Sequence, residues 1–416
     1  MADNKQLRLG AVGLGGRGRG QLSLMLQIEG VTVPAVCDIV PERVEYGVDL
    51  VESVPDMDYG VRGYADYREM LEKEELDALL ICTTWITHAR IAIDGMKAGC
   101  HCAIEVGGAA SIEECWEMVR TSERTGKFCM MLENCCYDKN EMAVYNMHKM
   151  GMFGELIHLS GGYQHDLRDE ISEGRENKHG RIHNFMRRNG ELYPTHQLGP
   201  IAKLLDINRG NRFLSLTSMA SKARGLNEYN KAKKGGDYDL AGYNFNQGDI
   251  VTTMIKCANG ETVSLIHDCC LPRPYSRNAR VQGTKGLWQE DGNRIYLEGV
   301  SPKNHEWEEF NPLYTDRYDH PLWSRYSYEG IKEGHGGMDW LVLSAFAESA
   351  VNDLTPPIDV YDTAAWMAIT CLSEDSIAMG SAPVAVPDFT NGRWIDREPF
   401  RRGVYCLDDV CSEFFK

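Results

Sequence analysis

The stretch that most constrains this chain is GLGGRG at residues 13–18. LRLGAV before it predicts a strand, and QLSLMLQI after it predicts a helix. In the pattern G-x-G-x-x-G the glycines permit a tight turn, close approach of a pyrophosphate, and close packing of helix on strand. The sequence therefore predicts a dinucleotide-binding turn that ends in a helix N-terminus. The turn residues expected at the cofactor are Gly13, Leu14, Gly15, Gly16, Arg17 and Gly18.

A carboxylate follows the glycine-rich turn at the sequence separation that is typical of ribose recognition. A second predicted strand, VTVPAVCD, ends in Asp38. This position lies about 20 residues after the last glycine, where an acidic side chain binds ribose hydroxyls and repels a 2'-phosphate. The expected cofactor is therefore NAD rather than NADP.

Strands and helices continue to alternate after Asp38. LDALLICTT, HCAIEV and KFCMMLEN read as buried strands, with amphipathic helices between them. This alternation predicts an α/β Rossmann domain, a doubly wound parallel sheet whose ligands bind at the carboxyl ends of the strands. The further cofactor residues expected at that edge are Thr83, Trp85, His88, Glu105, Val106 and Asn134.

The pattern changes in the second half of the chain. ELIHLSGGYQHD, RFLSLTSMAS and DIVTTMIKC alternate as strands do, and Asn-Gly at residues 259–260 indicates a hairpin. We expect an α+β C-terminal domain with a mostly antiparallel, open sheet. The predicted division is an NAD-binding domain over residues 1–134, a substrate and oligomerisation domain over 135–383, and an extension over 384–416 that packs back on the body.

Two polar stretches interrupt the predicted sheet. Residues 223–249 are rich in Asn, Lys and Gly, and we expect a flap there. Residues 302–330 are dense in Trp, Tyr and Phe. Such aromatic rings either pack as hydrophobic staples or stack on the apolar faces of sugars, and the sequence leaves both interpretations open.

Charge and composition exclude several classes of partner. The formal net charge is -17, with 61 acidic and 44 basic residues and no basic block, which argues against nucleic acid and anionic membranes. The sequence contains no run of about twenty apolar residues, so no membrane span is predicted. MADNKQLRLG is not a secretory signal, so we expect a cytoplasmic protein with reduced cysteines. An export signal removed from a longer precursor remains an alternative.

Cysteine and histidine do not predict a metal site. The 14 cysteines are scattered, and only Cys100-His101-Cys102 resembles a ligand group. No second ligand pair stands at the spacing of a zinc site, so the expected metal content is none.

One polar turn stands out in the second half. ELYPTHQLGP, residues 191–200, places Tyr193, Pro194, Thr195 and His196 where an apolar helix begins. By itself this is either a helix start with a buried histidine or a reaction centre.

Several motifs together decide between these interpretations. GLGGRG, ICTTWITH, AIEV and YPTH resemble the Gfo/Idh/MocA oxidoreductases. GGYQHDLR, RPYSR, GHGGMD, VYDTAAW and VPDFT more narrowly resemble glycoside hydrolase family 109, the NAD-dependent alpha-N-acetylgalactosaminidases. Dehydrogenases of the superfamily have Glu-Lys-Pro where this chain has Glu105, Val106 and Gly107, which disfavours a simple sugar dehydrogenase. The family usually has proline where Gly107 stands, which we interpret as a minor local change.

The resemblance implies a redox-assisted elimination. The sugar is transiently oxidised at carbon 3 by bound NAD, loses the carbon 2 proton and the aglycone, adds water and is reduced again. It implies that His196 is the base at the carbon 3 hydroxyl and that Tyr163 or Tyr193 handles the carbon 2 proton. The resemblance also implies substrate-binding residues, which are Tyr163, Arg181, Tyr193, Pro194, Thr195, His196 and Tyr275.

Two other functions remain open on the sequence. One is an NAD-dependent sugar dehydrogenase on the same scaffold, and the other is a non-catalytic protein that binds NAD or sugar. The expected partner in every case is a small-molecule or glycan-terminal sugar, and an open sheet face favours a homo-oligomer, a dimer or a tetramer.

Overall fold

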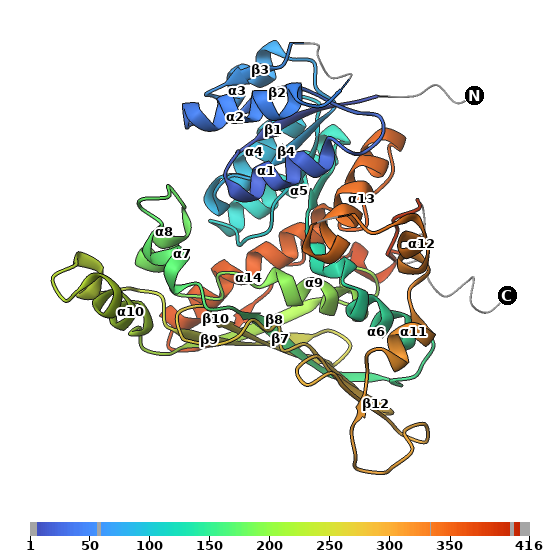
Figure 1. Cartoon of the computed structure of the whole chain (residues 1–416). Helices are drawn as coiled ribbons and strands as arrows, with labels where there is room; N and C mark the ends of the chain where they lie inside the picture. Colours follow the sequence, from blue (N-terminus) through green and yellow to red (C-terminus); the bar gives the residue numbers. More distant parts are fainter. Residues whose placement is uncertain (1–5, 56–59, 333, 400–402, 408–416) are drawn as a thin grey trace.

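A six-stranded parallel sheet forms one end of the molecule, drawn in blue and cyan in Figure 1. The computed structural model describes residues 6–55, 60–332, 334–399 and 403–407. The strand order is β3-β2-β1-β4-β5-β6, and each neighbouring pair runs parallel. The strands are β1 (Leu7–Val12), β2 (Val31–Cys37), β3 (Arg62–Tyr64), β4 (Ala78–Ile81), β5 (His101–Ile104) and β6 (Cys129–Met131). The predicted doubly wound sheet is confirmed.

Helices with recognisable ends connect these strands. α3 begins after Asp66, whose carboxylate accepts the N–H of Arg68, and α5 begins after Ser111, whose hydroxyl accepts the N–H of Glu114. α5 ends at Gly126, which has a φ of 71°. The helices are α1 (Gly16–Met25), α2 (Pro41–Glu52), α3 (Tyr67–Lys73), α4 (Trp85–Lys97) and α5 (Ile112–Thr125).

The second sheet has nine strands in the order β14-β13-β12-β11-β7-β10-β9-β8-β15. β7 and β10 run parallel and the other neighbours run antiparallel, so the predicted, mostly antiparallel sheet is confirmed. Along β9, buried and exposed residues alternate, because one face is covered and the other is open. The strands are β7 (Leu156–Gln164), β8 (Phe213–Ala220), β9 (Ile250–Cys257), β10 (Thr262–Asp268), β11 (Arg280–Gly283), β12 (Gly286–Gln289), β13 (Arg294–Leu297), β14 (Glu308–Glu309) and β15 (Val384–Ala385).

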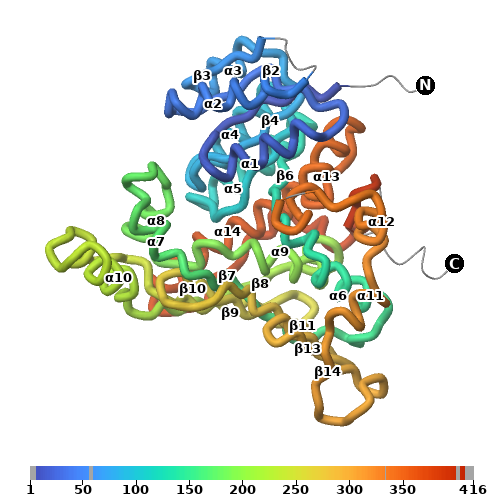
Figure 2. Tube along the Cα trace, in the orientation of Figure 1, coloured from blue at the N-terminus to red at the C-terminus, as the bar shows by residue number. Residues whose placement is uncertain are grey.

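Helix α14 (Val360–Ala378) lies between the two sheets, as Figures 1 and 2 show. Met131 of β6 donates its N–H to the hydroxyl of Thr363 at 3.1 Å. On the other side, Ser218 of β8 donates its N–H to the hydroxyl of Ser376 at 2.8 Å. The same helix is therefore bonded to both sheets.

The remaining helices lie beside the second sheet or between it and the parallel-sheet end. α9 packs on β7, and α13 packs against α1, which brings the second half of the chain next to the glycine-rich turn. These elements are η1 (Asn134–Tyr137), α6 (Lys139–Lys149), α7 (Arg168–Ser172), α8 (Arg181–Arg187), α9 (Thr195–Leu204), α10 (Gly225–Lys234), η2 (Asp239–Ala241), α11 (Leu313–Tyr318), α12 (Pro321–Glu329), η3 (His335–Gly337), α13 (Met338–Asn352) and η4 (Arg393–Ile395). In the part of the chain that the structure describes, no helix is long and apolar enough to cross a membrane.

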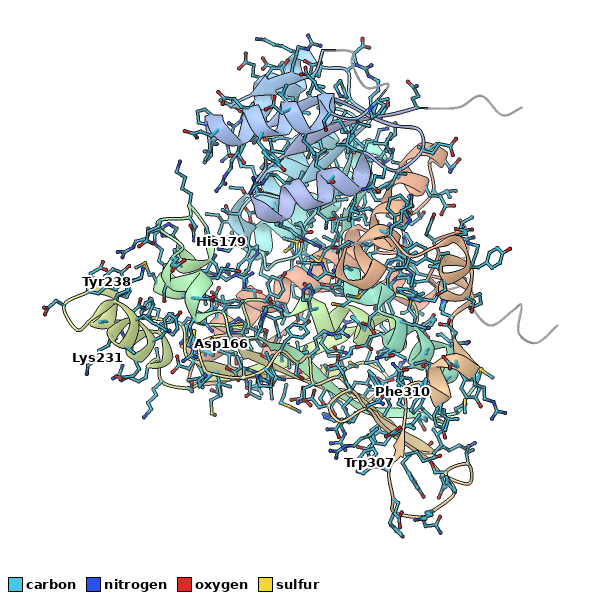
Figure 3. All side chains as sticks on the ribbon, viewed as in Figure 1. Asp166, His179, Lys231, Tyr238, Trp307 and Phe310 are labelled. Atoms are coloured by element: carbon cyan, nitrogen blue, oxygen red, sulfur yellow. The ribbon has the colours of Figure 1, made fainter. Side chains whose placement is uncertain are left out.

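The two polar stretches form ordered structure. Residues 223–249 contain α10, which is held by a 3.0 Å bond from the amide of Asn230 to the hydroxyl of Ser172. Residues 302–330 contain α11 and α12, and the rings of Phe310 and Tyr314 stack there with centroids 6.2 Å apart. Phe310 is buried, whereas Trp307 is partly exposed at the outer end of the sheet (Figure 3). The staple interpretation therefore holds for most of these aromatic residues.

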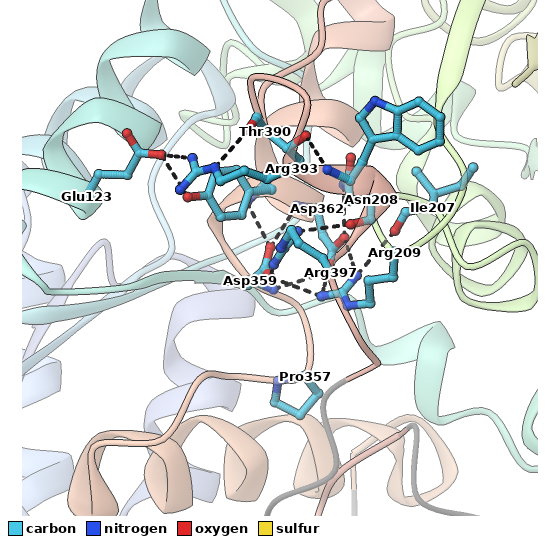
Figure 4. A network of polar contacts seen from close by, with 12 residues as sticks. Glu123, Ile207, Asn208, Arg209, Pro357, Asp359, Asp362, Thr390, Arg393 and Arg397 are labelled. Atoms are coloured by element: carbon cyan, nitrogen blue, oxygen red, sulfur yellow. Dashed lines mark hydrogen bonds and ion pairs between the residues drawn. The ribbon is translucent and has the colours of Figure 1, made fainter.

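A buried network of charges fastens the segment after β15 to the start of α14 (Figure 4). Arg209 donates two hydrogen bonds of 2.8 Å to the carboxylate of Asp362 and one of 3.0 Å to Asp359. Arg397 also binds Asp359. The Arg209 guanidinium and the nearby Lys203 hold the pKa of Asp362 well below its usual value, although burial opposes this. The segment that follows β15 thus packs back on the body through ion pairs.

Replacing Arg209 by leucine should lower the free energy of unfolding by about 3–5 kcal/mol, because two buried carboxylates lose the cation that they share. Urea unfolding followed by circular dichroism measures the change. Lys73→Met is the matched control, since it removes an exposed ion pair to Glu69 and should cost less than about 1 kcal/mol. Equal effects of the two substitutions would contradict a structural role for the buried network.

Candidate functional site

The glycine-rich turn between β1 and α1 has the shape that a dinucleotide needs. Gly13 has a φ of +91°, and a Cβ there would lie 2.6 Å from the carbonyl carbon of Cys82. A Cβ at Gly18 would lie 1.9 Å from the carbonyl oxygen of Gly13, so only glycine allows this approach of helix and strand. A Cβ at Gly16 would meet no atom within 4 Å. The outer glycines therefore fix the turn, and its middle leaves room for a pyrophosphate.

Asp38 follows β2 and holds the same turn. Its carboxylate accepts the N–H of Leu14 at 2.7 Å and that of Val40 at 2.9 Å. A carboxylate has about four acceptor sites, so capacity remains for the ribose hydroxyls. The residues of the turn and Asp38 therefore fit NAD.

Some residues after β4 are exposed at the predicted cofactor edge, and one is buried behind them. Thr83 and Trp85 are partly exposed at the strand end. His88 is 1% exposed, and its Nε2 lies 3.0 Å from the carbonyl oxygen of Thr83. Burial lowers the pKa of His88. This placement favours His88 as a neutral support for Thr83 over a direct cofactor contact.

Arg17 joins the cofactor side of the site to the second half of the chain. Its Nε donates to Glu105 at 2.7 Å, and its two terminal nitrogens donate to Asp339 at 2.7 and 2.8 Å. The amide of Asn134 donates to Asp339 at 2.7 Å, and Glu105 Oε2 accepts the N–H of Val106 at 3.1 Å. One ionic junction, with buried carboxylates around a partly exposed guanidinium, thus joins the glycine-rich turn, the ends of β5 and β6, and the start of α13.

The GHGGMD motif supplies the α13 side of this junction. His335 Nδ1 lies 2.6 Å from Asp339 Oδ2 and 3.2 Å from Arg17 Nη1. Burial opposes ionisation of Asp339, but His335 and Arg17 hold the pKa of its carboxyl below the usual 3.8. The hydrogen bond to Asp339 raises the pKa of His335.

Tyr163, Tyr193 and His196 form an aromatic cluster beside this junction. The ring centroids of Tyr163 and Tyr193 are 4.4 Å apart, and His196 lies 5.3 Å from the first and 4.9 Å from the second. The ring of Trp85 lies 5.4 Å from that of Tyr193. The structure thus brings the three predicted catalytic residues together and connects them to the predicted cofactor edge.

Tyr275 and His165 lie at the outer side of the cluster. Tyr275 is 52% exposed, and its ring centroid is 6.3 Å from Tyr163 and 5.1 Å from His165. The hydroxyl of Tyr163 lies 3.1 Å from His165 Nδ1, within hydrogen-bond reach. His165 is half-buried and therefore links the buried phenol to a more open position.

Arg181 provides positive charge next to both tyrosines. Its Cζ lies 5.5 Å from the Tyr193 ring centroid and 5.3 Å from that of Trp85. Burial opposes its charge, yet Tyr163 and Glu170 raise the pKa of Arg181 above its usual value. Burial raises the pKa of Tyr163 to about 12, and the charge of Arg181 partly offsets that rise. Burial also raises the pKa of Tyr193 well above its usual value.

The turn before α9 presents His196 and buries its neighbours. Pro194 precedes the helix, and Thr195, the first residue of the helix, is 0% exposed. His196 is partly exposed. Thr195 therefore supports the turn from within, while His196 has access to the cluster.

Sequence reasoning missed several members of this site. Glu133 is fully buried, with Oε1 2.8 Å from His196 Nδ1. Glu191 is also fully buried, and burial raises its pKa to about 8. Glu133 lies in LENCCY and Asp339 lies in GHGGMD. These motifs were the only sequence signal that could have identified the two residues as part of the site.

Groups that could bind a metal do not form an independent site. Within the described residues, Glu133, Cys135 and His196 offer ligand atoms that all lie within 4.8 Å of one another. The hydrogen bond between His196 and Glu133 accounts for most of this proximity. The thiols of Cys100 and Cys102 instead donate to backbone carbonyls of Leu76 and Ala92.

Comparison with known proteins decides the family. Residues 7–133 match the model of the oxidoreductase family with an NAD-binding Rossmann fold, and residues 137–396 match that of the glycosyl hydrolase 109 C-terminal domain. The chain belongs to glycoside hydrolase family 109. The predicted family and NAD as the cofactor are both confirmed.

Relatives in family 109 extend over nearly the whole chain. An alpha-N-acetylgalactosaminidase of Tannerella forsythia is 44% identical over 94% of this chain and 88% of its own length. A glycosyl hydrolase family 109 protein of Parabacteroides distasonis is 40% identical over 95% of this chain and 90% of its own length.

Solved structures show the same fold at low identity. An inositol dehydrogenase homologue of Azotobacter vinelandii, complexed with NADH and myo-inositol, has a TM-score of 0.66 and 16% identity over 92% of this chain and 98% of that one. The WlbA dehydrogenase of Bordetella pertussis, in complex with NADH and UDP-GlcNAcA, has a TM-score of 0.65 and 16% identity over 93% and 99%. These likenesses concern the fold alone.

Gly107 stands where the resemblance to family 109 implies a proline. It has a φ of +151°, and a Cβ there would lie 2.4 Å from Cδ1 of Trp85. Proline fixes φ near −65° and cannot adopt this conformation. The backbone at Gly107 therefore determines where the Trp85 indole lies next to Tyr193.

Gly107→Ala should destabilise the protein by more than the roughly 1–2 kcal/mol that a left-handed alanine costs, because the indole must also move. Gly99→Ala is the matched control, since Gly99 has a φ of +95° and open space around its Cβ position. Urea unfolding of both variants tests this. A loss no larger than that of Gly99→Ala would show that Trp85 is not held by Gly107.

Asp339→Asn should lower the free energy of unfolding at pH 7 by about 1.5–3 kcal/mol, the range for hydrogen bonds to charged groups. Because the pKa of Asp339 is lower in the folded protein, its contribution is complete above pH 3.8 and is lost as the pH falls further. Urea unfolding at pH 7 and pH 3 should show a difference from the unsubstituted protein that shrinks at pH 3. Asp49→Asn, at an exposed position of α2, is the control and should be neutral.

Proposed function

We propose that the protein is a glycosidase that uses bound NAD to hydrolyse N-acetylgalactosaminides or related glycosides. The observation that carries this proposal is the cluster of Tyr163, Tyr193 and His196 next to the ionic junction of the glycine-rich turn. The named activity of the Tannerella forsythia relative supports the substrate class. When bound, NAD supplies reversible oxidation at sugar carbon 3, which acidifies the proton on carbon 2.

His196 is the proposed base at the carbon 3 hydroxyl. Its Nδ1 faces Glu133, which leaves Nε2 as the atom that accepts the proton of the hydroxyl. Imidazole suits this role because its free pKa is near neutrality. The same proton returns to the oxygen when the sugar is reduced at the end of the cycle.

Tyr163 is the proposed base at carbon 2. A phenol with a pKa of about 12 loses its proton only next to positive charge, and Arg181 supplies that charge. The hydrogen bond from Tyr163 to His165 provides a path for the proton towards solvent. Tyr193 stays protonated and contacts the sugar, with its pKa raised by burial.

The remaining predicted residues are proposed to orient the substrate. Arg181 has five donors for sugar oxygens or the acetamide carbonyl. Tyr275 is exposed enough to contact the aglycone side. Pro194 and Thr195 hold the turn that carries His196.

The sugar dehydrogenase alternative is supported by the fold alone. Val106 follows Glu105 at the end of β5, where dehydrogenases of the resembling superfamily have lysine. An aliphatic side chain cannot transfer a proton, so the chain lacks that dehydrogenase's base at this position. A non-catalytic binding protein would not need the hydrogen-bonded pair of His196 and Glu133, so this pair argues against that alternative.

Organisation and location are part of the proposal. We propose the division into residues 1–134, 135–383 and 384–416, a cytoplasmic location, and a homo-oligomer that pairs through the open face of the second sheet. Support for pairing comes from four large apolar side chains exposed on its strands. They are Ile157, Leu214, Met219 and Met254.

The function is tested with NAD-loaded protein and p-nitrophenyl alpha-N-acetylgalactosaminide in deuterated water. We expect nitrophenol release without added reductant, and deuterium at carbon 2 of the released sugar. His196→Ala should keep its NAD and lose about 10²–10⁴-fold in rate, the usual contribution of a general base. Protium alone at carbon 2 would exclude elimination, and NADH accumulation with free sugar but no nitrophenol release would instead establish the dehydrogenase.

A further inference from the structure

Glu133 stands between the parallel sheet and the reaction centre. It follows β6, after Leu132, and its side chain has no exposed surface. Oε1 lies 2.8 Å from Nδ1 of His196 and also accepts the N–H of Cys135 at 3.1 Å. Within the described part of the chain, Oε2 has no hydrogen-bond partner. The imidazole lies within hydrogen-bond distance of this carboxylate, and the side chain of Thr195 also stabilises its charge.

Two other buried glutamates differ from Glu133 in the direction of their pKa shift. Glu141 and Glu191 are both buried, and burial raises the pKa of each to about 8, which keeps them largely neutral. Burial opposes the charge of Glu133 as well, but His196 holds the pKa of Glu133 below its usual value. Of these three glutamates, Glu133 is the one whose pKa is lowered, with His196 the largest favourable cause and Thr195 and the N–H of Cys135 adding to it.

We propose that Glu133 is a positioning residue for His196. The carboxylate keeps the proton of the neutral imidazole on Nδ1, so that Nε2 is unprotonated and directed to the sugar. It also stabilises the imidazolium that forms when Nε2 takes the hydroxyl proton: the O–H bond breaks, an N–H bond forms, and Glu133 itself stays ionised. This inference rests on the proposed function, in which His196 is the base at carbon 3.

The surroundings make the pair rigid. Gly199, one turn after His196 on α9, faces Glu133, and a Cβ there would lie 2.8 Å from Cγ of Glu133. The backbone N–H of Cys135 fixes Oε1 from the other side. Both partners are thus held by backbone, since Glu133 follows a strand of one sheet and His196 lies on the helix that covers the other. A dyad of this kind orients a base without contacting substrate.

The test compares Glu133→Gln and Glu133→Asp with Glu141→Gln, all as NAD-loaded protein. Glu133→Gln should reduce kcat by at least about 100-fold, with KM changed less than about 3-fold and NAD content unchanged, because a neutral amide cannot stabilise the imidazolium. Glu133→Asp should recover part of kcat. Glu141→Gln replaces a buried, largely neutral acid that bonds α9 through Gln197, so its kcat should stay within about 3-fold of the unsubstituted protein.

A second readout does not depend on turnover. Protein with ¹⁵N-labelled histidine reports which nitrogen of His196 carries the proton, and comparison with His196→Gln assigns the signals. At pH 8 the unsubstituted protein should show a protonated Nδ1, and Glu133→Gln should lose that preference. An unchanged nitrogen pattern, or a kcat within about 3-fold of normal, would overturn the role of Glu133. If the unsubstituted protein cleaves no nitrophenyl glycoside, the proposed function fails, while the nitrogen signals still decide whether Glu133 orients His196.

Discussion

The arrangement of the site depends on the ion pairs that the guanidinium of Arg17 makes. Two buried carboxylates, Glu105 and Asp339, approach it from different halves of the chain. Without a cation between them they would repel one another and take up protons. Because Arg17 belongs to the glycine-rich turn, the same contacts fix that turn relative to β5 and α13. The separation between the cofactor turn and the aromatic cluster follows from this single charge arrangement.

Burial and charge act in opposite directions within the cluster, and their balance prepares it for proton transfer. Burial keeps the phenols of Tyr163 and Tyr193 protonated, and Arg181 is the cation that favours a phenolate. In the proposed mechanism, Arg181 is therefore the group that would stabilise a phenolate when a proton is transferred. Paired carboxylic acids, the usual apparatus of glycosidases, are not needed for such chemistry.

Local sequence signals predicted the elements of the site, but they did not predict the contacts between residues that are far apart in the sequence. The glycine turn, Asp38 and the start of α9 depend on neighbouring residues, so a single sequence reveals them. Arg17 and Asp339 are 322 residues apart, and no local pattern shows that they meet. In the segment over residues 223–249, where the sequence predicted a flap, the amide of Asn230 is buried and bonds α10 to Ser172, a long-range contact that the composition does not show.

The position of α14 between the sheets has a consequence for how the protein is made. β6 is bonded to Thr363, which lies 232 residues later in the chain. At 5–20 residues per second, a ribosome needs roughly 10–50 s to supply that partner. During this interval β6 lacks the hydrogen-bond partner that α14 provides. The contact between the parallel sheet and α14 can therefore form only after the second sheet's strands up to β14 have been synthesised.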